Sequence, residues 1–233
     1  MRSQMRRSGC FHEQWRLRRF PSETDPGTAE SPQTIAPAGF YTQLMEVPLF
    51  PLRTVLYPGG PLRLRIFEQR YLDMFSRCMK SELPFGVLLI REGNETGPAK
   101  TFDIGTLAHI VDWYQGSDGL LGVTVTGTER FRLLSERREP DGLLIGEIEL
   151  LPASFDCPLP DQYKPLSKIL KGVIDGLGQL YSDLDTHYDD AGWVSYRFAE
   201  ILSIPLGQKQ SCLENDDAID RMESIRTVLD LRS

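Results

Sequence analysis

The 233-residue chain has few of the residues that build metal centres and hydrolytic sites, with only four cysteines and three histidines. The cysteines are far apart, and none belongs to a CxxC pair, so the spacing of a zinc site is absent. They are Cys10, Cys78, Cys157 and Cys212. We therefore predict reduced cysteines, no metal and no cofactor, as is usual for a cytoplasmic protein.

Three further absences narrow the function. No apolar run approaches the roughly 18 residues that a membrane-spanning helix needs, so we predict no membrane partner. The formal net charge is −7, which makes a nucleic-acid partner unlikely by composition. No GxxxxGK[ST] segment is present, so the chain lacks the glycine-rich loop that cradles nucleotide phosphates.

The residue types that could carry out catalysis do not combine into a convincing site. Ser167 and Lys168 are adjacent on a predicted helix, and neighbours in a helix point to different faces. His109 lies in an apolar strand segment, where a core or barrel-face position is expected, and His187 lies in an acidic loop. A Cys78–His109 nucleophile pair has no support from the pattern. We predict no catalytic residue.

The first 44 residues do not show the pattern of a folded segment. Six arginines fall within the first 19 positions, and Ser, Thr, Pro, Gly and acidic residues dominate positions 21–39. No apolar periodicity is present, which is typical of a disordered extension. An organelle transit peptide and a true translation start at Met45 are the alternatives. No apolar segment follows Arg6-Arg7, which disfavours a secretory signal.

Residues 45–152 show the pattern of a β domain. Apolar residues alternate with polar ones in several segments, and turn residues such as Pro58-Gly59-Gly60 separate them. One helix is expected near Glu68–Lys80, where apolar residues recur at three-to-four spacing. A strand is expected at the short apolar run bracketed by Pro48 and Pro51, and a second one over Leu62–Ile66. The other expected strands are Phe85–Ile90, Ile104–Tyr114, Leu121–Thr126 continuing through Glu129–Glu136, and Leu143–Leu150. Such regular spacing indicates a closed or nearly closed barrel.

Residues 153–233 change to a helical period. An apolar stripe from Tyr163 to Leu184, including Val173 and Leu177, predicts one long helix. A second helix is expected after a cap at Asp189 or Asp190, a short one over Gln208–Glu214, and a last one after a cap at Asp216 or Asp217. The pattern therefore predicts a small helical bundle with its own core.

Several segments together resemble the Lon N-terminal (substrate-binding) domain family. The first is VPLFPLRTVLYPGGPLRLRIFEQRY, residues 47–71, which matches through Pro48-Leu49-Phe50-Pro51-Leu52, Tyr57-Pro58-Gly59, Ile66-Phe67-Glu68 and Arg70-Tyr71. Gly105–Trp113 and Asp118–Leu134 are similar to the family's central sheet. Residues similar to its helix pattern are Trp193, Arg197, Phe198, Ala199, Glu200, Lys209, Gln210 and Leu213. The extension of 44 residues lies outside the pattern.

The resemblance implies an α+β fold, a PUA-like β pseudo-barrel with one inserted helix followed by a C-terminal helical bundle. It also implies a stand-alone, non-catalytic module without the ATPase and peptidase domains of Lon proteases, which binds unfolded or extended polypeptide segments. Such a module would serve as an adaptor or accessory in protein quality control; its oligomeric state stays open.

Aromatic and proline side chains are the candidates for peptide contact, namely Phe50, Tyr57, Pro58, Trp113 and Tyr114. Two other functions remain as alternatives. One is a hydrolase or peptidase with an unrecognised site. The other is a nucleic-acid or small-ligand binder that uses the barrel, although the chain lacks a basic face.

Overall fold

The computed structural model describes residues 44–95, 97, 99–153 and 156–230. The predicted disordered extension, residues 1–44, lies outside the described part except for Leu44, which is the first residue of a strand. Among the described residues, no helix combines the length and the apolar character needed to cross a bilayer.

Five strands form a closed ring in the order β1-β7-β6-β5-β3, because β1 also pairs with β3. The β1–β3 pairing is parallel, and the other ring pairings are antiparallel. The strands are β1 Leu44–Leu52, β2 Pro61–Ile66, β3 Phe85–Gly93, β4 Ala99–Thr101, β5 Ile104–Gln115, β6 Leu121–Arg138 and β7 Leu144–Leu150. The ring confirms the predicted barrel; β2 and β4 pair with it from outside, through β6 and β3.

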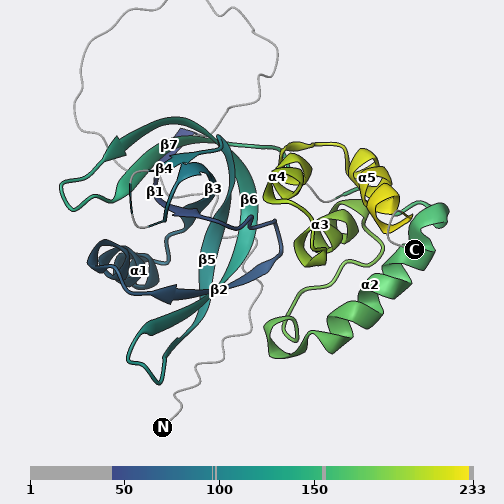
Figure 1. Ribbon diagram of the computed structural model, residues 1–233, viewed down its shortest axis with the longest axis horizontal. Helices are drawn as coiled ribbons and strands as arrows, with labels where there is room; N and C mark the ends of the chain where they lie inside the picture. Colours follow the sequence, from purple (N-terminus) through teal and green to yellow (C-terminus); the bar gives the residue numbers. More distant parts are fainter. Residues whose placement is uncertain (1–43, 96, 98, 154–155, 231–233) are drawn as a thin grey trace, which may run out of the picture. The chain divides into compact units, whose positions relative to one another are not determined.

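Strand β6 is long enough to pair with three other strands of the sheet. Its second half, Phe131 to Arg138, pairs with β7 as part of the ring. Its first half, Leu121 to Thr126, pairs with β2 on one side and with the end of β5 on the other. The result is a three-stranded extension, β2-β6-β5, that runs beyond the ring and ends in the turn at residues 116–120 (Figure 1).

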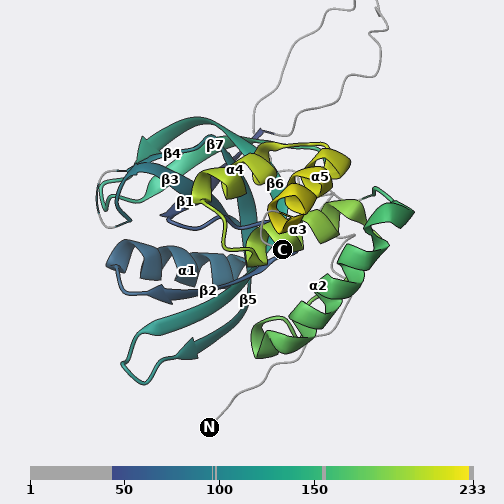
Figure 2. The ribbon, with the colours of Figure 1, turned by 45° about the vertical axis from the view of Figure 1, so that its right-hand side comes forward.

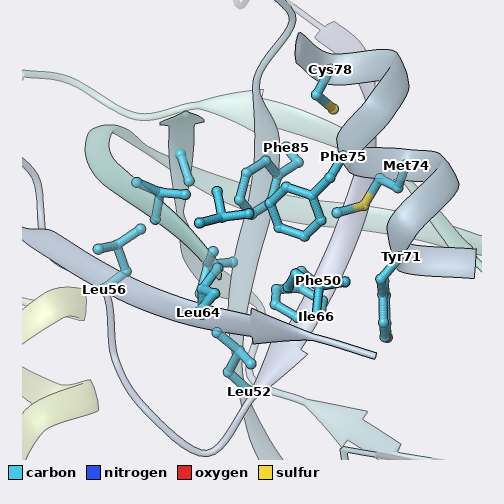
Figure 3. Packing of buried hydrophobic residues seen from close by; sticks show 14 of the residues in the cluster. Phe50, Leu52, Leu56, Leu64, Ile66, Tyr71, Met74, Phe75, Cys78 and Phe85 are labelled. Atoms are coloured by element: carbon cyan, nitrogen blue, oxygen red, sulfur yellow. The ribbon is translucent and has the colours of Figure 1, made fainter. Parts of the chain in front are cut away.

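Helix α1 (Gln69–Ser81) covers the apolar face of this extension and one opening of the ring. Its buried residues Tyr71, Met74, Phe75 and Cys78 recur at helical spacing and point into the same cluster as Phe50 and Phe85 (Figure 3). The rings of Phe75 and Phe85 lie 4.9 Å apart in an edge-to-face arrangement, which adds to the free energy of apolar burial. The predicted helix is confirmed.

The helical part contains α2 (Lys164–Gly176), α3 (Ala191–Ile201), α4 (Leu206–Glu214) and α5 (Ala218–Asp230). The Asp190 carboxylate accepts a hydrogen bond from Trp193 N at 2.6 Å, and Asp217 accepts one from Ile219 N at 2.8 Å. These bonds satisfy helix N-terminal amides. Of the predicted caps, Asp190 rather than Asp189 and Asp217 rather than Asp216 are therefore confirmed.

The long helix predicted up to Leu184 is wrong in length, and its predicted apolar stripe is only partly buried. α2 ends at Gly176, and Gly178 adopts a left-handed conformation with φ +77°, which a helix cannot continue through. Leu170 and Ile174 are buried, while Val173 and Leu177 stay 40% and 42% exposed. The predicted stripe included the buried Leu170 correctly, but it continued through Val173 and Leu177 instead of Ile174.

Two smaller corrections concern the strands. The expected loop from Glu92 to Lys100 is partly strand, since β3 continues to Gly93 and β4 begins at Ala99. The expected strand ending at Ile90 is therefore longer than predicted. Alternation fades in this segment because residues 91–95 are all exposed, so no buried face marks the pairing.

The barrel and the helical part each have apolar clusters of their own, and a further cluster includes residues from both. It contains Val55, Tyr57, Leu89 and Ile104 from the barrel, together with Tyr196, Ala199 and Leu213 from α3 and α4. The sequence pattern did not predict this shared cluster. We keep 45–152 and 153–233 as the proposed domain boundaries, with the shared cluster as their common surface.

Candidate functional site

The five predicted contact residues fall into two groups that lie in different parts of the fold. Phe50, Tyr57 and Pro58 are buried, whereas Trp113 and Tyr114 are 61% and 45% exposed. Only exposed side chains can meet a partner without a change in the protein. The direct contact surface therefore has to be sought around the second group.

Phe50 belongs to the aromatic core beneath α1. Its ring lies 4.4 Å from Tyr71, 5.7 Å from Phe75 and 6.3 Å from Phe85, each in an edge-to-face arrangement. Burial raises the pKa of Tyr71 from its ordinary value. Phe50 thus holds β1 against α1.

Tyr57, Pro58 and the two following glycines form the surface on which α3 and α4 pack, and we call residues 57–60 the junction turn. The Tyr57 hydroxyl donates to the Lys209 carbonyl at 2.8 Å, and its ring lies 5.3 Å from Tyr196. Burial strongly raises the pKa of Tyr57. Gly59 has φ +67° and donates its N–H to the Gly127 carbonyl at 2.8 Å.

Arg197 of α3 is the main polar partner of the junction turn. Its side chain is fully buried, and Nη2 donates a hydrogen bond to the Pro58 carbonyl at 3.0 Å. The same Nη2 forms an ion pair with Glu200 Oε2, also at 3.0 Å. A Cβ added at Gly60 would lie 2.5 Å from Glu200 Oε2 and 2.8 Å from Arg197 Nη2. Only glycine leaves room there for this ion pair, so the turn and the helix are matched in shape.

Further buried polar contacts join the two parts beside the turn. Arg130 of β6 donates to the Leu213 carbonyl at 2.9 Å and to Asp216 at 2.6 Å. Gln210 of α4 donates to the Ile104 carbonyl at 3.0 Å. Sequence reasoning placed Arg197, Gln210 and Leu213 in the family pattern but missed that they form this junction. The sequence did contain a signal for this junction: Arg197 lies between apolar residues in a predicted helix, and a charged residue in that position needs a buried partner.

Trp113 and Tyr114 lie near the end of β5, on opposite faces of the three-stranded extension. Tyr114 pairs with Gly122 of β6, and its ring covers that glycine so closely that no Cβ would fit. Beside it, Arg65 of β2 and Asp118 of the turn form an ion pair. These residues line a small hollow of about 190 Å³ on the outer face.

Trp113 continues the apolar face that α1 covers. Register places Trp113 beside Val123 of β6, which in turn lies beside Leu64 of β2. Leu64 and Val123 are buried in the core, but Trp113 is mostly exposed. The preceding Val111, at a bulge in the β5–β6 ladder, is 59% exposed. Sequence reasoning missed Val111, because it lies in a continuous apolar run.

A second apolar surface lies on α2, where Ile169, Val173 and Leu177 are exposed at intervals of four residues. Gly172 and Gly176 share this side of the helix, and nothing lies within 4 Å of an added Cβ at either position. This face is helical, so it has no strand edge and offers a partner mainly side-chain contact.

The candidates for catalysis remain separate in the structure. The Ser167 hydroxyl donates to the Tyr188 carbonyl at 2.7 Å, whereas Lys168 is exposed. Burial raises the pKa of the Cys78 thiol to about 11, so it is protonated and a poor nucleophile at neutral pH. Burial also lowers the pKa of His109. Within the described ranges, no group of three or more His, Cys, Asp or Glu is placed to hold a metal ion.

A larger hollow of about 290 Å³ lies where β3, β5 and β6 meet the end of α4. Its lining is mixed in charge: Arg91 and Arg132 oppose Asp103, Glu214 and Asp216. Opposite charges that face one another in this way give no preference for an ion of either sign. The hollow is therefore a weaker candidate for a binding site than the exposed end of β5.

The chain is similar to known proteins along most of its length. The family model described as the ATP-dependent protease La (LON) substrate-binding domain matches residues 46–230. Lon protease 2 of Myxococcus xanthus is 26% identical over 220 residues, which cover 89% of this chain and 27% of that protein. A Lon protease of Paraburkholderia phytofirmans is 30% identical over 189 residues, covering 76% and 23%. The chain thus spans about a quarter of the length of these curated relatives.

Solved structures agree with the sequence comparisons. A Lon N-terminal domain protein from Xanthomonas campestris is 34% identical with a TM-score of 0.66, covering 78% of this chain and 98% of that one. The N-terminal domain of Lon protease from Mycobacterium avium complex, at 16% identity and a TM-score of 0.54, shares the fold. The ring of strands with one inserted helix, the helical part and the match over residues 46–230 together show that this chain belongs to the LON substrate-binding domain family.

Proposed function

We propose that this chain is a non-catalytic module that binds unfolded or extended polypeptide segments and acts as an adaptor or accessory in protein quality control. The family match carries the proposal, because it covers residues 46–230 with a substrate-binding domain. The curated relatives are named as proteases, and this chain matches about a quarter of their length. Binding rather than hydrolysis is the task that this part supports.

The exposed end of β5 is the proposed contact surface. Val111, Trp113 and Tyr114 place an aliphatic and two aromatic side chains within four residues, all well exposed. Tryptophan and tyrosine supply much of the binding free energy in many interfaces. Phe50, Tyr57 and Pro58 are buried and have packing roles instead: Phe50 packs against α1, and Tyr57 and Pro58 bond to the helical part.

We expect weak binding, with dissociation constants of about micromolar or weaker, because a flexible chain loses conformational entropy on a shallow surface. The net charge of −7 should favour segments flanked by Lys or Arg and make the affinity fall moderately with salt. A cytoplasmic location belongs to the same proposal. Cys78, Cys157 and Cys212, the cysteines within the described part, are all unpaired.

A titration of the full chain with fluorescent peptides tests the proposal. Trp113→Ala should weaken the affinity for apolar extended peptides about tenfold, since it removes a large exposed aromatic anchor. Ile169→Ala is the matched control, because Ile169 is 56% exposed on α2. It should leave the affinity within about twofold of the wild type.

Two outcomes would contradict the proposal. No binding above background across a peptide array, or tight binding of an RNA oligonucleotide instead, would show that polypeptide recognition is absent. Cleavage of casein or hydrolysis of ATP that disappears on substitution of one residue of this chain would contradict the non-catalytic assignment.

A further inference from the structure

The end of β5 has an edge that no described strand covers. Strand β3 pairs with β5 only where Phe85 to Val87 meet Thr106 to Ala108. Beyond Ala108, β5 continues for seven residues to Gln115 with β6 on its other side. Residues 111–115 are all exposed. An edge of this kind presents backbone N–H and C=O groups that a further strand can pair with.

The turn at the end of the hairpin shows which backbone groups face the open edge. The Gly116 N–H donates to the Leu120 carbonyl at 2.8 Å. In an antiparallel ladder, hydrogen-bonded pairs alternate with pairs whose backbone groups point outward. Tyr114 and Asp112 therefore bond toward β6, paired with Gly122 and Thr124. The backbone groups of Trp113 and Gln115 point away from β6, to the open edge.

The two edges of the three-stranded extension differ in protection. Strand β2, at the far edge, begins with Pro61 and carries Arg63 and Arg65, both exposed. Proline and charged side chains are the usual means of blocking edge pairing. The β5 edge carries Val111, Trp113 and Tyr114, and its one charged residue is Asp112. It is therefore the edge that accepts an additional strand.

We propose that the bound polypeptide adds to this edge as a β-strand, paired with residues Val111–Gln115 of β5. This inference rests on the proposed function and specifies how the segment is bound. A residue opposite Trp113 would extend the apolar row Leu64–Val123–Trp113. A residue beside Asp112 would lie on the outer face, where a Lys or Arg forms a favourable cross-strand pair. The occupant is thus an extended segment in which apolar residues alternate with basic ones.

A backbone substitution on β5 separates strand addition from side-chain contact. Gln115→Pro removes the outward N–H, and proline is tolerated where the N–H of an edge strand is not used within the sheet. Gln115→Ala removes the side chain and keeps the N–H. With one hydrogen bond lost, Gln115→Pro should weaken peptide affinity about three- to tenfold, and Gln115→Ala less than twofold.

A scan of the peptide gives an independent readout that does not depend on the folding of a variant. Single N-methylation along a binding peptide should weaken affinity at alternate positions only, since one edge of an added strand faces β5. If peptides bind but the scan shows no alternation, and Gln115→Pro equals Gln115→Ala, strand addition is overturned while the proposed function stands. If no peptide binds, the proposed function itself has failed.

Other occupants of the edge would appear in the same experiments. Sedimentation velocity of the full chain that shows a dimer abolished by Gln115→Pro would assign the edge to a second copy and overturn the inference. If a chain beginning at Leu44 bound the peptide more than tenfold more tightly than the full chain does, the open edge would be assigned to residues 1–43. Under the inference, the full chain neither dimerises through this edge nor gains affinity on that truncation.

Discussion

The junction turn and the open end of β5 lie in the same barrel, and both carry tyrosine beside other apolar residues, but they do opposite things. At the junction turn, Tyr57 is 1% exposed and its hydroxyl is bonded to α4. At the end of β5, Tyr114 is 45% exposed and covers only a glycine of the neighbouring strand. The first region uses its aromatic residue to join two parts of the protein, and the second leaves its aromatic residues open to a partner.

The difference shows that a family pattern can record packing as well as contact. Much of the resemblance lies at the junction, where Tyr57 and Pro58 bond to Lys209 and Arg197. There Gln210 also joins α4 to the barrel through the Ile104 carbonyl. Their contacts explain why these residue types are needed together. The residues that can contact a polypeptide lie instead at the end of a hairpin, where the side chains are exposed and packing constrains them little.

The largest effect is expected when the buried arginine of the junction is removed. Arg197→Leu leaves the Pro58 carbonyl and the mostly buried Glu200 without their charged partner. Loss of one member of such a pair should lower the free energy of unfolding by about 3–5 kcal/mol. Urea denaturation gives the value. Arg226→Leu, at a pair with Glu223 that is 46% exposed on both sides, should change it by less than about 0.5 kcal/mol.

An intermediate effect is expected from one methyl group at the junction turn. Gly60→Ala places a Cβ against the buried Arg197–Glu200 pair, and overpacking should cost about 1–3 kcal/mol. The same change at Gly172, where nothing lies within 4 Å, should stabilise α2 by up to about 1 kcal/mol. Thermal unfolding of the two variants should move in opposite directions; two shifts of the same sign would contradict the packing described for the turn.

The fold could be predicted wherever burial imposes a period on the sequence. The strands of the ring, α1 and the caps at Asp190 and Asp217 followed from alternation, helical spacing and capping chemistry. The buried side of the second half of α2 could not, because Val173 and Ile174 are adjacent aliphatic residues and either one fits the apolar spacing after Leu170. Which side is buried depends on helices that are distant in sequence.

The candidate contact residues show the same limit. Aromatic and proline residues in a strand-rich segment indicate either core or contact, and sequence does not show what a distant helix covers. Tyr57 and Pro58 are covered by α3 and α4, whereas Trp113 lies past the point where β3 stops pairing. The end of that pairing is a property of the three-dimensional ladder and has no local signal.

A smaller effect is expected at alkaline pH. Because burial raises the folded-state pKa of Tyr57 above its ordinary value near 10, the unfolded chain loses this proton first as pH rises. Stability should therefore be constant up to about pH 10 and then fall by about 1.4 kcal/mol per pH unit for this group. Tyr57→Phe should cost about 1 kcal/mol at neutral pH and show a shallower decline above pH 10. Equal slopes for both proteins would contradict the burial of this hydroxyl.

The smallest effect on stability is expected at the open end of β5. Trp113→Ala removes a side chain that is 61% exposed, so the free energy of unfolding should change by about 0.5 kcal/mol or less. Denaturant midpoints of the variant and the wild type test this. A loss above about 2 kcal/mol would mean that Trp113 packs as part of the core, and its proposed role in contact would fall.

Hydrogen exchange of the full chain, measured with and without a saturating apolar peptide, tests the division between the two regions most directly. Figure 2 shows the hairpin at the end of β5 projecting away from α3, the helix that contacts the junction turn. New protection is expected at the backbone amides of Trp113 and Gln115, which face the open edge. The junction turn and α3, already buried and bonded, should exchange at the same rates in both states. Protection that appears at residues 57–60 or in α3, with β5 unchanged, would contradict the account.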